Sequence, residues 1–386
     1  MSATALTGYR YDSLIAAGGV GAGIAFQLLT GETLGRNESR PAVLLSARDY
    51  CKGHVVLHYV ATLLRTAMPG APKVVPIGRV GDDRDGHRLL EEMRATGMST
   101  EYVIVDPDLP TLYSVSYQYP DSSGGNLTAC NSASGALTTT DVARPFEAST
   151  AQERAVVVAL PEVPLDARLR LLQHGRERAA LTVASIVPEE AEAFEAAGGW
   201  ELVDIAALNV DEAAAVARVP GDLDGGEIAR RCAATVSSRH PDIVLIVTDG
   251  RRGNYLCAKG EIEHTPALAM TPVSTAGAGD AFLAGVIVGL ICGLPLQRRV
   301  PATDGSLILS TAVDLGALLG SLSIASPHTI NPEVDAAAVA ALIAARGLQV
   351  TAQFESLFTS RDRLMPALLP MSRSQDESPA SICATF

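Results

Sequence analysis

Residues 271–290, TPVSTAGAGDAFLAGVIVGL, place three small residues directly before the only carboxylate of the segment, Asp280. The run that follows, residues 281–290, carries no charge and has the length and apolarity of a buried helix. Small residues where a loop enters a helix let backbone N–H groups approach an anion, and the helix dipole adds to the attraction. The stretch therefore predicts a phosphate-binding helix N-terminus with a carboxylate beside it.

Asp280 is placed to act as a base if this loop holds a phosphoryl group. A carboxylate there could accept the proton of an attacking hydroxyl, which contributes about 10²–10⁴-fold in rate. The alternative is an ordinary glycine-rich helix entry with Asp280 as its N-cap. The segment by itself leaves both interpretations open.

Composition restricts the class of protein and its partners. The 386 residues are enough for one large α/β domain with an appendage, and the six scattered cysteines show neither a C-x-x-C pair nor zinc spacing. We therefore expect a reduced, cytoplasmic setting. The formal net charge of -13 and the pI near 5.0 argue against nucleic acid or an anionic membrane as the main partner.

The apolar segment of residues 13–29 raises the questions of a membrane span and of a dinucleotide-binding loop. It is marginal in length for a span and rich in glycine, so a buried strand followed by tight backbone through Gly23 is the better interpretation. A G-x-G-x-x-G fingerprint would need its third glycine at Ile24 or Phe26, and it therefore fails.

Residues 271–290 resemble the carboxy-terminal signature of the PfkB (ribokinase-like) carbohydrate kinases, D-T-x-G-A-G-D-x-F. The matching residues are Thr275, Gly277, Ala278, Gly279, Asp280 and Phe282. The resemblance implies that Gly277, Ala278 and Gly279 form an anion hole and that Asp280 is the catalytic base. Ser274 stands where the family commonly has an Asp that helps to hold a monovalent cation, which leaves potassium activation open.

Further matches to the same family lie upstream. Residues 78–86 resemble its G-x-V-G-x-D-x-x-G stretch. Asn209 and Glu212 match N-x-x-E, which implies a magnesium site; by residue type alone the pair also reads as a helix capping box. Thr248, Gly250 and Gly253 match the nucleotide-side T-x-G-x-x-G, which by itself would predict a hairpin turn. Asn331 lies in a later loop, residues 326–332, that could border the adenine of ATP.

The acceptor half of the resemblance is weaker. Gly23 occupies the position of a sugar-binding Asp, and of the family's G-G-x-x-x-N signature only Gly53 has a counterpart. Lys52 beside it could face the acceptor or could simply be a polar residue at a helix start. Arg36, Asn37 and Arg40 form a dense polar cluster that could hold a polar or anionic acceptor; the alternative is a solvated loop.

The order of elements predicts the fold. Strands alternate with helices from residue 155 onward, which predicts a parallel sheet covered on both faces. The alternating residues 111–119 and the following residues 126–130 predict a hairpin, by analogy part of a lid that excludes water. The expected fold is α/β, a ribokinase-like three-layer sandwich with a central mostly parallel sheet and a small β lid. Residues 1–346 would form the kinase domain, with lid strands including residues 111–130, and residues 347–386 a partly disordered extension.

The predicted function is transfer of the γ-phosphoryl group of ATP, with Mg²⁺, to an alcohol of a small polar acceptor: a sugar, a nucleoside or a sugar phosphate. No nucleic acid or membrane is expected as a partner, and edge strands of the lid could pair two protomers into a homodimer. One alternative is a non-catalytic nucleotide- or sugar-binding regulatory protein on the same fold. A second, a dinucleotide-dependent oxidoreductase, is disfavoured by the failed fingerprint.

Overall fold

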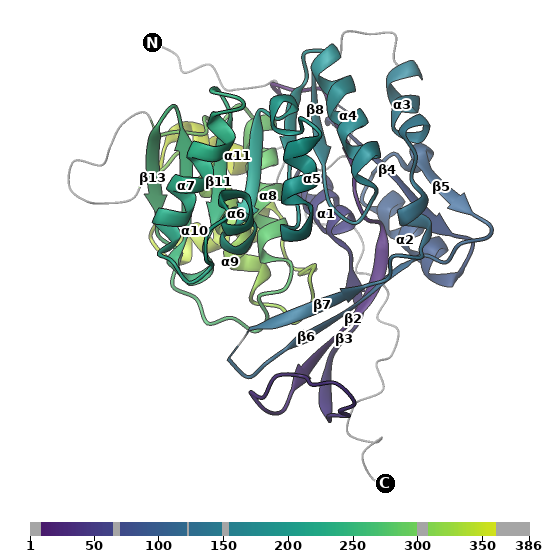
Figure 1. Cartoon of the computed structure of the whole chain (residues 1–386). Coiled ribbons are helices and arrows are strands. Elements are labelled where there is room, and N and C mark those ends of the chain that lie inside the picture. Colours follow the sequence, from purple (N-terminus) through teal and green to yellow (C-terminus); the bar gives the residue numbers. More distant parts are fainter. Residues whose placement is uncertain (1–8, 65–69, 122, 149–153, 299–307, 360–386) are drawn as a thin grey trace.

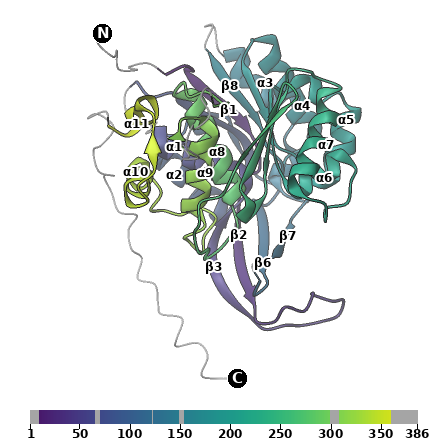
Figure 2. The ribbon, with the colours of Figure 1, turned by 90° about the vertical axis from the view of Figure 1, so that its left-hand side faces the viewer.

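A computed structural model describes residues 9–64, 70–121, 123–148, 154–298 and 308–359 of the chain. Within these residues a large twisted sheet lies between two layers of helices, and a smaller sheet extends from one end (Figures 1 and 2). The strands of the large sheet are, in spatial order, β13 (Glu261–Thr265), β12 (Asn254–Ala258), β11 (Val244–Thr248), β10 (Ile205–Asn209), β9 (Leu181–Ala184), β8 (Ala155–Ala159), β1 (Ser13–Ala17), β4 (Lys73–Gly81) and β5 (Val103–Asp106). Neighbouring strands run parallel except along β11, β12 and β13, which are antiparallel. The predicted mostly parallel sheet is confirmed.

Alternate residues of the buried central strand β1 belong to two separate hydrophobic cores, one on each face of the sheet. Leu14 and Ala16 of β1 belong to one apolar cluster, whereas Ile15 and Ala17 belong to the other, as the two-residue period of a strand requires. The first face is covered by α1 (Lys52–Leu64), α2 (Arg84–Ala95), α8 (Ala278–Ile291), α9 (Ala312–Ser323), α10 (Ala336–Ala345) and α11 (Ala352–Thr359). The second is covered by α3 (Thr139–Ala148), α4 (Leu165–Glu177), α5 (Ala191–Ala196), α6 (Val210–Ala217) and α7 (Gly225–Ser237). This is the expected three-layer sandwich.

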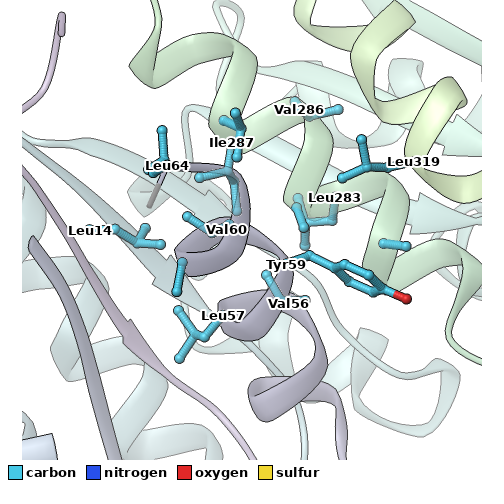
Figure 3. Close-up of a cluster of buried hydrophobic side chains, with 14 of the residues drawn as sticks. Leu14, Val56, Leu57, Tyr59, Val60, Leu64, Leu283, Val286, Ile287 and Leu319 are labelled. Carbon is cyan, nitrogen blue, oxygen red and sulfur yellow. The ribbon is translucent and has the colours of Figure 1, made fainter. Parts of the chain in front are cut away.

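Helix α8 is the predicted buried helix, and it begins three residues earlier than the uncharged run. All of its residues from Ala281 to Ile291 are buried, so it is apolar on every side rather than along one stripe. Leu283 and Ile287 of α8 lie beside Val56 and Val60 of α1 (Figure 3). The first helix and the eighth, far apart in sequence, thus share one core.

The smaller sheet is the lid, and it has four strands in the described residues: in spatial order β3 (Ala42–Tyr50), β2 (Gly21–Leu28), β6 (Leu112–Gln118) and β7 (Gly124–Thr128). The predicted hairpin is present as the antiparallel pair β6 and β7. The expectation of tight backbone through Gly23 is wrong, because β2 begins at Gly21. The glycine serves close packing: a Cβ on Gly21 would lie 2.5 Å from the Leu112 carbonyl oxygen and 2.6 Å from the Cys51 sulfur.

The chain beyond Gly347 does not start as a loose extension. Strand β15 (Gln349–Val350) pairs with β14 (Ile308–Leu309), and α11 follows. Phe354 of α11 is fully buried in the core that contains α8, so packing continues to the end of the described residues. Residues 360–386, the rest of the expected extension, lie outside them. Among the described residues, no helix has both the length and the apolarity needed to cross a membrane.

Candidate active site

Three chain segments meet tightly at the carboxyl ends of β1 and β8. The backbone N–H of Gly19 donates to the carbonyl of Pro161 over 3.1 Å, and that of His54 donates to the carbonyl of Gly19 over 3.3 Å. A Cβ on Gly53 would lie 2.7 Å from the carbonyl carbon of Gly18, so only glycine fits there. These contacts place the first residue of α1, Lys52, against the ends of two strands.

Lys52 connects carboxylates from two other segments. Its Nζ atom lies 3.5 Å from Oε1 of Glu212, at the start of α6. Its backbone N–H donates to Oε2 of Glu162, just after β8, over 2.9 Å. Asp280, in the first turn of α8, interacts electrostatically with the same ammonium group. Lys52 therefore joins three carboxylates that are distant in sequence.

The protonation of this cluster is set by burial and by its charges. Burial raises the pKa of Asp280 to about 6, with the positive charge of Lys52 opposing the rise and the negative charge of Glu212 adding to it. Burial alone would lower the pKa of Lys52, but the charges of Asp280, Glu212 and Glu162 raise it above its usual value. The lysine is thus held as a cation, and Asp280 titrates close to neutral pH, as suits a general base.

Glu162 is a site residue that sequence reasoning missed. Burial raises its pKa to about 7, with Lys52 opposing the rise. Its φ of 72° is in the left-handed region, which a glutamate rarely adopts and which costs about 1–3 kcal/mol. The one sequence signal is a glutamate three residues after a fully apolar strand, which is too common to single out.

Asn209 and Glu212 form the capping box that their residue types predicted. The side chain of Asn209 accepts from the N–H of Glu212, and Oε2 of Glu212 accepts from the N–H of Asn209, both over 2.8 Å. The other carboxylate oxygen of Glu212 faces Lys52. One buried carboxylate with an amide oxygen nearby suits Mg²⁺, which takes its remaining ligands from water and phosphate. The described residues contain no cluster of three or more His, Cys, Asp or Glu side chains able to hold a metal.

Thr248, Gly250 and Gly253 lie next to this pair. Asn209 and Thr248 are register partners at the ends of β10 and β11. The residues after Thr248 form the turn of a hairpin, with a short 3₁₀ helix at Gly250–Arg252 and left-handed φ values of 50° at Gly250 and 104° at Gly253. A Cβ on Gly253 would lie 2.0 Å from the carbonyl oxygen of Thr265, so the turn requires glycine there.

Helix α8 begins at the small residues, as the sequence predicted. Gly277 is the N-cap with a φ of 76° and makes no side-chain cap, so the alternative that Asp280 is the N-cap is wrong. Asp280 is half-buried as a residue and its neighbour Gly279 is exposed, so the start of the helix reaches the surface beside the buried carboxylate. Ser274, in the position of the family's cation-holding Asp, is buried and its Oγ accepts from the N–H of Ala276 over 3.2 Å.

Asn331 is committed to contacts within its own part of the fold. Its side-chain amide donates to the carbonyl of Leu322 over 2.9 Å, and its Oδ1 accepts from the N–H of Glu333 over 3.1 Å. Its backbone N–H donates to the Tyr59 hydroxyl over 2.7 Å. Asn331 thus shapes the loop that follows α9.

Arg36, Asn37 and Arg40 lie apart from the Lys52 cluster, in the loop between β2 and β3. Figures 1 and 2 both show this loop at the outer end of the lid. Arg40 forms ion pairs with Glu38 at 2.7 Å and with Glu32 at 3.2 Å, both within the loop. The structure therefore brings together Lys52, Gly53, Asn209, Glu212 and Asp280, but not these three residues.

The position of the family's sugar-binding Asp is closed. A Cβ on Gly23 would lie 2.6 Å from the Ser114 hydroxyl and 2.8 Å from the Ser114 carbonyl oxygen. Gly23 is paired with Asp49 on one side and with Ser114 on the other. The neighbouring strand β6 therefore fills the space that a larger side chain would need.

Comparison with known proteins identifies relatives of this chain. A family described as pfkB family carbohydrate kinase matches residues 57–336. A fructokinase of Klebsiella pneumoniae is 37% identical over 86 residues, covering 22% of this chain and 27% of the relative. The chain spans less than two thirds of the length of the curated relatives that it matches first, 27% and 60% of the first two.

Two solved structures show the fold. The nucleoside kinase of Burkholderia thailandensis in complex with inosine has a TM-score of 0.65 at 20% identity, covering 87% of this chain and 99% of that one. The ribokinase of Cryptococcus neoformans in complex with ADP has a TM-score of 0.65 at 18% identity, covering 86% and 99%. The ribokinase-like expectation for the fold is confirmed, and the dinucleotide-binding alternative has no support.

Proposed function

The chain belongs to the pfkB family of carbohydrate kinases, and we propose that it transfers the γ-phosphoryl group of ATP to an alcohol group of a small polar acceptor. The observation that carries the proposal is the convergence of Lys52, Glu212 and Asp280 at the N-terminus of a buried helix. This arrangement would offer one cation, one metal ligand and one base beside the start of α8.

Gly277, Ala278 and Gly279 would hold the transferred group. The backbone N–H groups of a first helical turn have no partner within the helix and point along its axis. The N–H of Ala278 donates to the carbonyl of Thr275 over 3.3 Å, so it would have to exchange this partner for a phosphate oxygen. Lys52 would add a positive charge beside the same oxygens. Stabilising charge on the transferred group is the main contribution of a protein to phosphoryl transfer.

Asp280 is the base in this proposal. Its carboxylate accepts the proton of the acceptor hydroxyl, the hydroxyl oxygen forms a bond to the γ-phosphorus, and the bond from that phosphorus to the bridging oxygen of ADP breaks. A pKa of about 6 keeps most of Asp280 deprotonated at neutral pH. The released ADP keeps the electron pair of the broken bond, so charge and atoms balance.

Magnesium would be held by Glu212 and Asn209 together with phosphate oxygens. Bound there, it would neutralise phosphate charge and favour release of ADP. Thr248, Gly250 and Gly253 would border the nucleotide from the β11 side, and Asn331 would position the loop on the adenine side. The support for this placement is the register of Asn209 with Thr248, which brings Asn209 and the turn after Thr248 to one edge of the sheet.

The acceptor would bind between the lid and the Lys52 cluster, against Lys52 and Gly53. A sugar, a nucleoside or a sugar phosphate would each present the required hydroxyl. Arg36, Asn37 and Arg40 are left out of this acceptor site, because they lie in the loop between β2 and β3, where Arg40 pairs with Glu32 and Glu38.

The proposal is tested by ADP release in a coupled assay with MgATP. The panel is fructose, ribose, inosine, fructose 6-phosphate and ribose 5-phosphate, each with and without EDTA. We expect acceptor-dependent ADP release that EDTA abolishes. Binding of nucleotide without turnover on any acceptor would overturn the kinase proposal.

A second candidate function is a non-catalytic nucleotide- or sugar-binding regulatory protein. The closed position at Gly23 favours it, because the carboxylate that orients sugar hydroxyls in similar proteins has no room there. The same assay separates the two functions. The regulatory protein would bind ligand in a thermal-shift screen but release no ADP.

We further propose a homodimer formed through the lid, in a cytoplasmic setting. Val43 and Leu44 on edge strand β3 and Leu127 on edge strand β7 are large, apolar and exposed, a combination typical of strands that a second copy covers. Buried Cys51, Cys232 and Cys257 are not joined in disulfides, which fits a reducing compartment. Light scattering after size exclusion tests the dimer, and a monomer at every concentration would contradict it.

A further inference from the structure

A single threonine in the loop after α9, Thr329, contacts three separate parts of the site. It lies next to Gly277 at the start of α8, to Asp49 at the end of lid strand β3, and to Tyr59 of α1. None of these contacts is local in sequence. The loop therefore joins the lid to the segment that would hold the phosphoryl group.

The contact with the lid is a buried, charge-assisted one. Oδ1 of Asp49 accepts from both the N–H and the hydroxyl of Thr329, the N–H at 3.2 Å. The N–H of Tyr50 donates back to the Thr329 hydroxyl over 3.3 Å. Asp49 is 1% exposed and Thr329 6% exposed. Breaking this contact would leave a buried carboxylate with lost partners, which is costly.

Thr329 packs tightly against Gly277 at the start of α8. A Cβ on Gly277 would lie 2.7 Å from the Thr329 carbonyl oxygen and 3.1 Å from its Cα, so the two backbones are packed directly together. The Tyr59 hydroxyl donates to the same carbonyl over 3.4 Å and accepts from Asn331 N–H over 2.7 Å. In Figure 3 this hydroxyl points out of the apolar cluster that holds the ring.

Because Asp49 of β3 is hydrogen-bonded to Thr329, a shift of β3 would displace Thr329. Because the backbone of Thr329 packs against Gly277, a displaced Thr329 would in turn displace Gly277. We propose that Asp49 and Thr329 are positioning residues that couple the lid to the Gly277–Gly279 loop, so that the loop is shaped for a terminal phosphate only when the contact between them is intact. This inference rests on the proposed function, because it gives the loop a phosphoryl group to hold. Neither residue touches the reacting atoms.

The test compares affinities for Mg–AMP-PNP and Mg–ADP by titration calorimetry. Only AMP-PNP carries a terminal phosphate that reaches the loop, so general damage to the fold would weaken both ligands alike. Thr329→Val, which removes the hydroxyl and keeps the shape, loses both the bond that the hydroxyl donates to Asp49 and the bond that it accepts from the Tyr50 N–H. It should lower the affinity for AMP-PNP about tenfold relative to ADP. Thr329→Ser restores the hydroxyl and should restore the ratio.

Asp49→Asn provides a second variant that removes only the charge, and it should shift the ratio in the same direction. The matched control is Asp106→Asn, since Asp106 also caps backbone N–H groups but lies on β5 at the edge of the sheet. An unchanged ratio in both Thr329→Val and Asp49→Asn would overturn the coupling alone. Failure of the unsubstituted protein to bind AMP-PNP and ADP would overturn the proposed function and the coupling with it.

Discussion

The Nζ atom of Lys52 lies 3.5 Å from Oε1 of Glu212, while the backbone N–H of the same lysine donates to Glu162. One residue at a helix start therefore contacts a carboxylate from the first turn of α6 and another from the loop after β8. Because Asp280 interacts with the same ammonium group, three carboxylates share one cation. The positive charge of Lys52 should therefore help to set the pKa of Asp280, the proposed base.

The pH dependence of turnover follows from this arrangement. Asp280 works as a base only when deprotonated, and its pKa is about 6, so kcat/KM should fall as the pH drops through about 6. Lys52→Met removes the charge that opposes the rise of that pKa, so the acidic limb of the profile should move to higher pH. The measurement is kcat/KM from pH 5 to 9 with the best acceptor of the panel. Lys259→Met, in an exposed turn between β12 and β13, is the matched control, and a limb that stays in place in Lys52→Met would contradict the assignment.

Replacing the base tests its role directly. Asp280→Asn keeps the size of the side chain but cannot accept the proton, so kcat should fall about 10²–10⁴-fold with little change in the affinity for Mg–AMP-PNP. The measurement pairs steady-state kinetics with calorimetric binding. Asp242→Asn, exposed before β11, should leave both quantities unchanged. Full turnover in Asp280→Asn would remove Asp280 from the mechanism.

The places of Asn209 and Thr248 in the fold could be predicted because each residue follows its own strand. Asn209 and Thr248 end neighbouring parallel strands, which brings them to one edge of the sheet, and Asp280 lies in the first turn of a helix that small residues precede. The local spacing of residues was therefore enough to predict where these side chains lie. The predicted layers could be read for the same reason, since strands and helices alternate along the chain.

The features of the site and lid that were not predicted depend on contacts between residues far apart in sequence. Glu162 lies 110 residues from its hydrogen-bond partner Lys52, and Asp49 lies 280 residues from Thr329. Gly21 and Gly23 suggested a turn by residue type, but they are glycines because β6 and Cys51 pass close to them. Arg36 and Arg40 looked like ligand-binding residues because charge density in sequence does not reveal where a hairpin loop ends in space.

Substitution by alanine should affect the stability of the fold differently at two glycines near the start of α8, Gly277 and Gly279. Gly279→Ala adds a Cβ that meets no atom within 4 Å, in a helix, so stability should rise by up to about 1 kcal/mol. The same Cβ faces open space beside the loop, so affinity for Mg–AMP-PNP should fall. Gly277→Ala is the contrast: its φ of 76° and the 2.7 Å approach to Thr329 should destabilise the fold. Thermal unfolding and calorimetry measure the two effects, and unchanged AMP-PNP affinity in Gly279→Ala would count against the anion hole.

The C-terminal helix α11 should behave as part of the core. Phe354→Ala removes a fully buried ring and should lower the free energy of unfolding by about 3–5 kcal/mol. Urea unfolding measures it. Gln353→Ala, one residue earlier and partly exposed, should cost far less, since it loses one hydrogen bond to the carbonyl of Gly293. Equal small effects would show that α11 is the loose extension that composition first indicated.

Two histidines of α1 should make stability fall in acid. Burial lowers the pKa of His54 well below its usual value and that of His58 to about 4, so both stay neutral in the folded protein. In the described part of the chain, both ring nitrogens of His54 and Nδ1 of His58 have no hydrogen-bond partner. The unfolded chain takes up protons near pH 6.5. The free energy of unfolding therefore does not depend on the titration of these two histidines above that pH. As the pH falls toward 4, it should decrease by up to about 2.7 kcal/mol per pH unit for the pair.

The double variant His54→Leu, His58→Leu should flatten this dependence, because the unfolded state then gains two fewer protons. Asp280 and Glu162, whose pKa values are raised in the fold, act with the opposite sign and are unchanged in the variant, so the difference between the two proteins isolates the histidines. Urea unfolding at half-unit steps from pH 5 to 8 gives the slopes. His87→Leu, which replaces an exposed histidine, should leave the slope as it is. Parallel slopes in the original protein and the double variant would mean that the two imidazoles are already charged, or solvated, in the folded state.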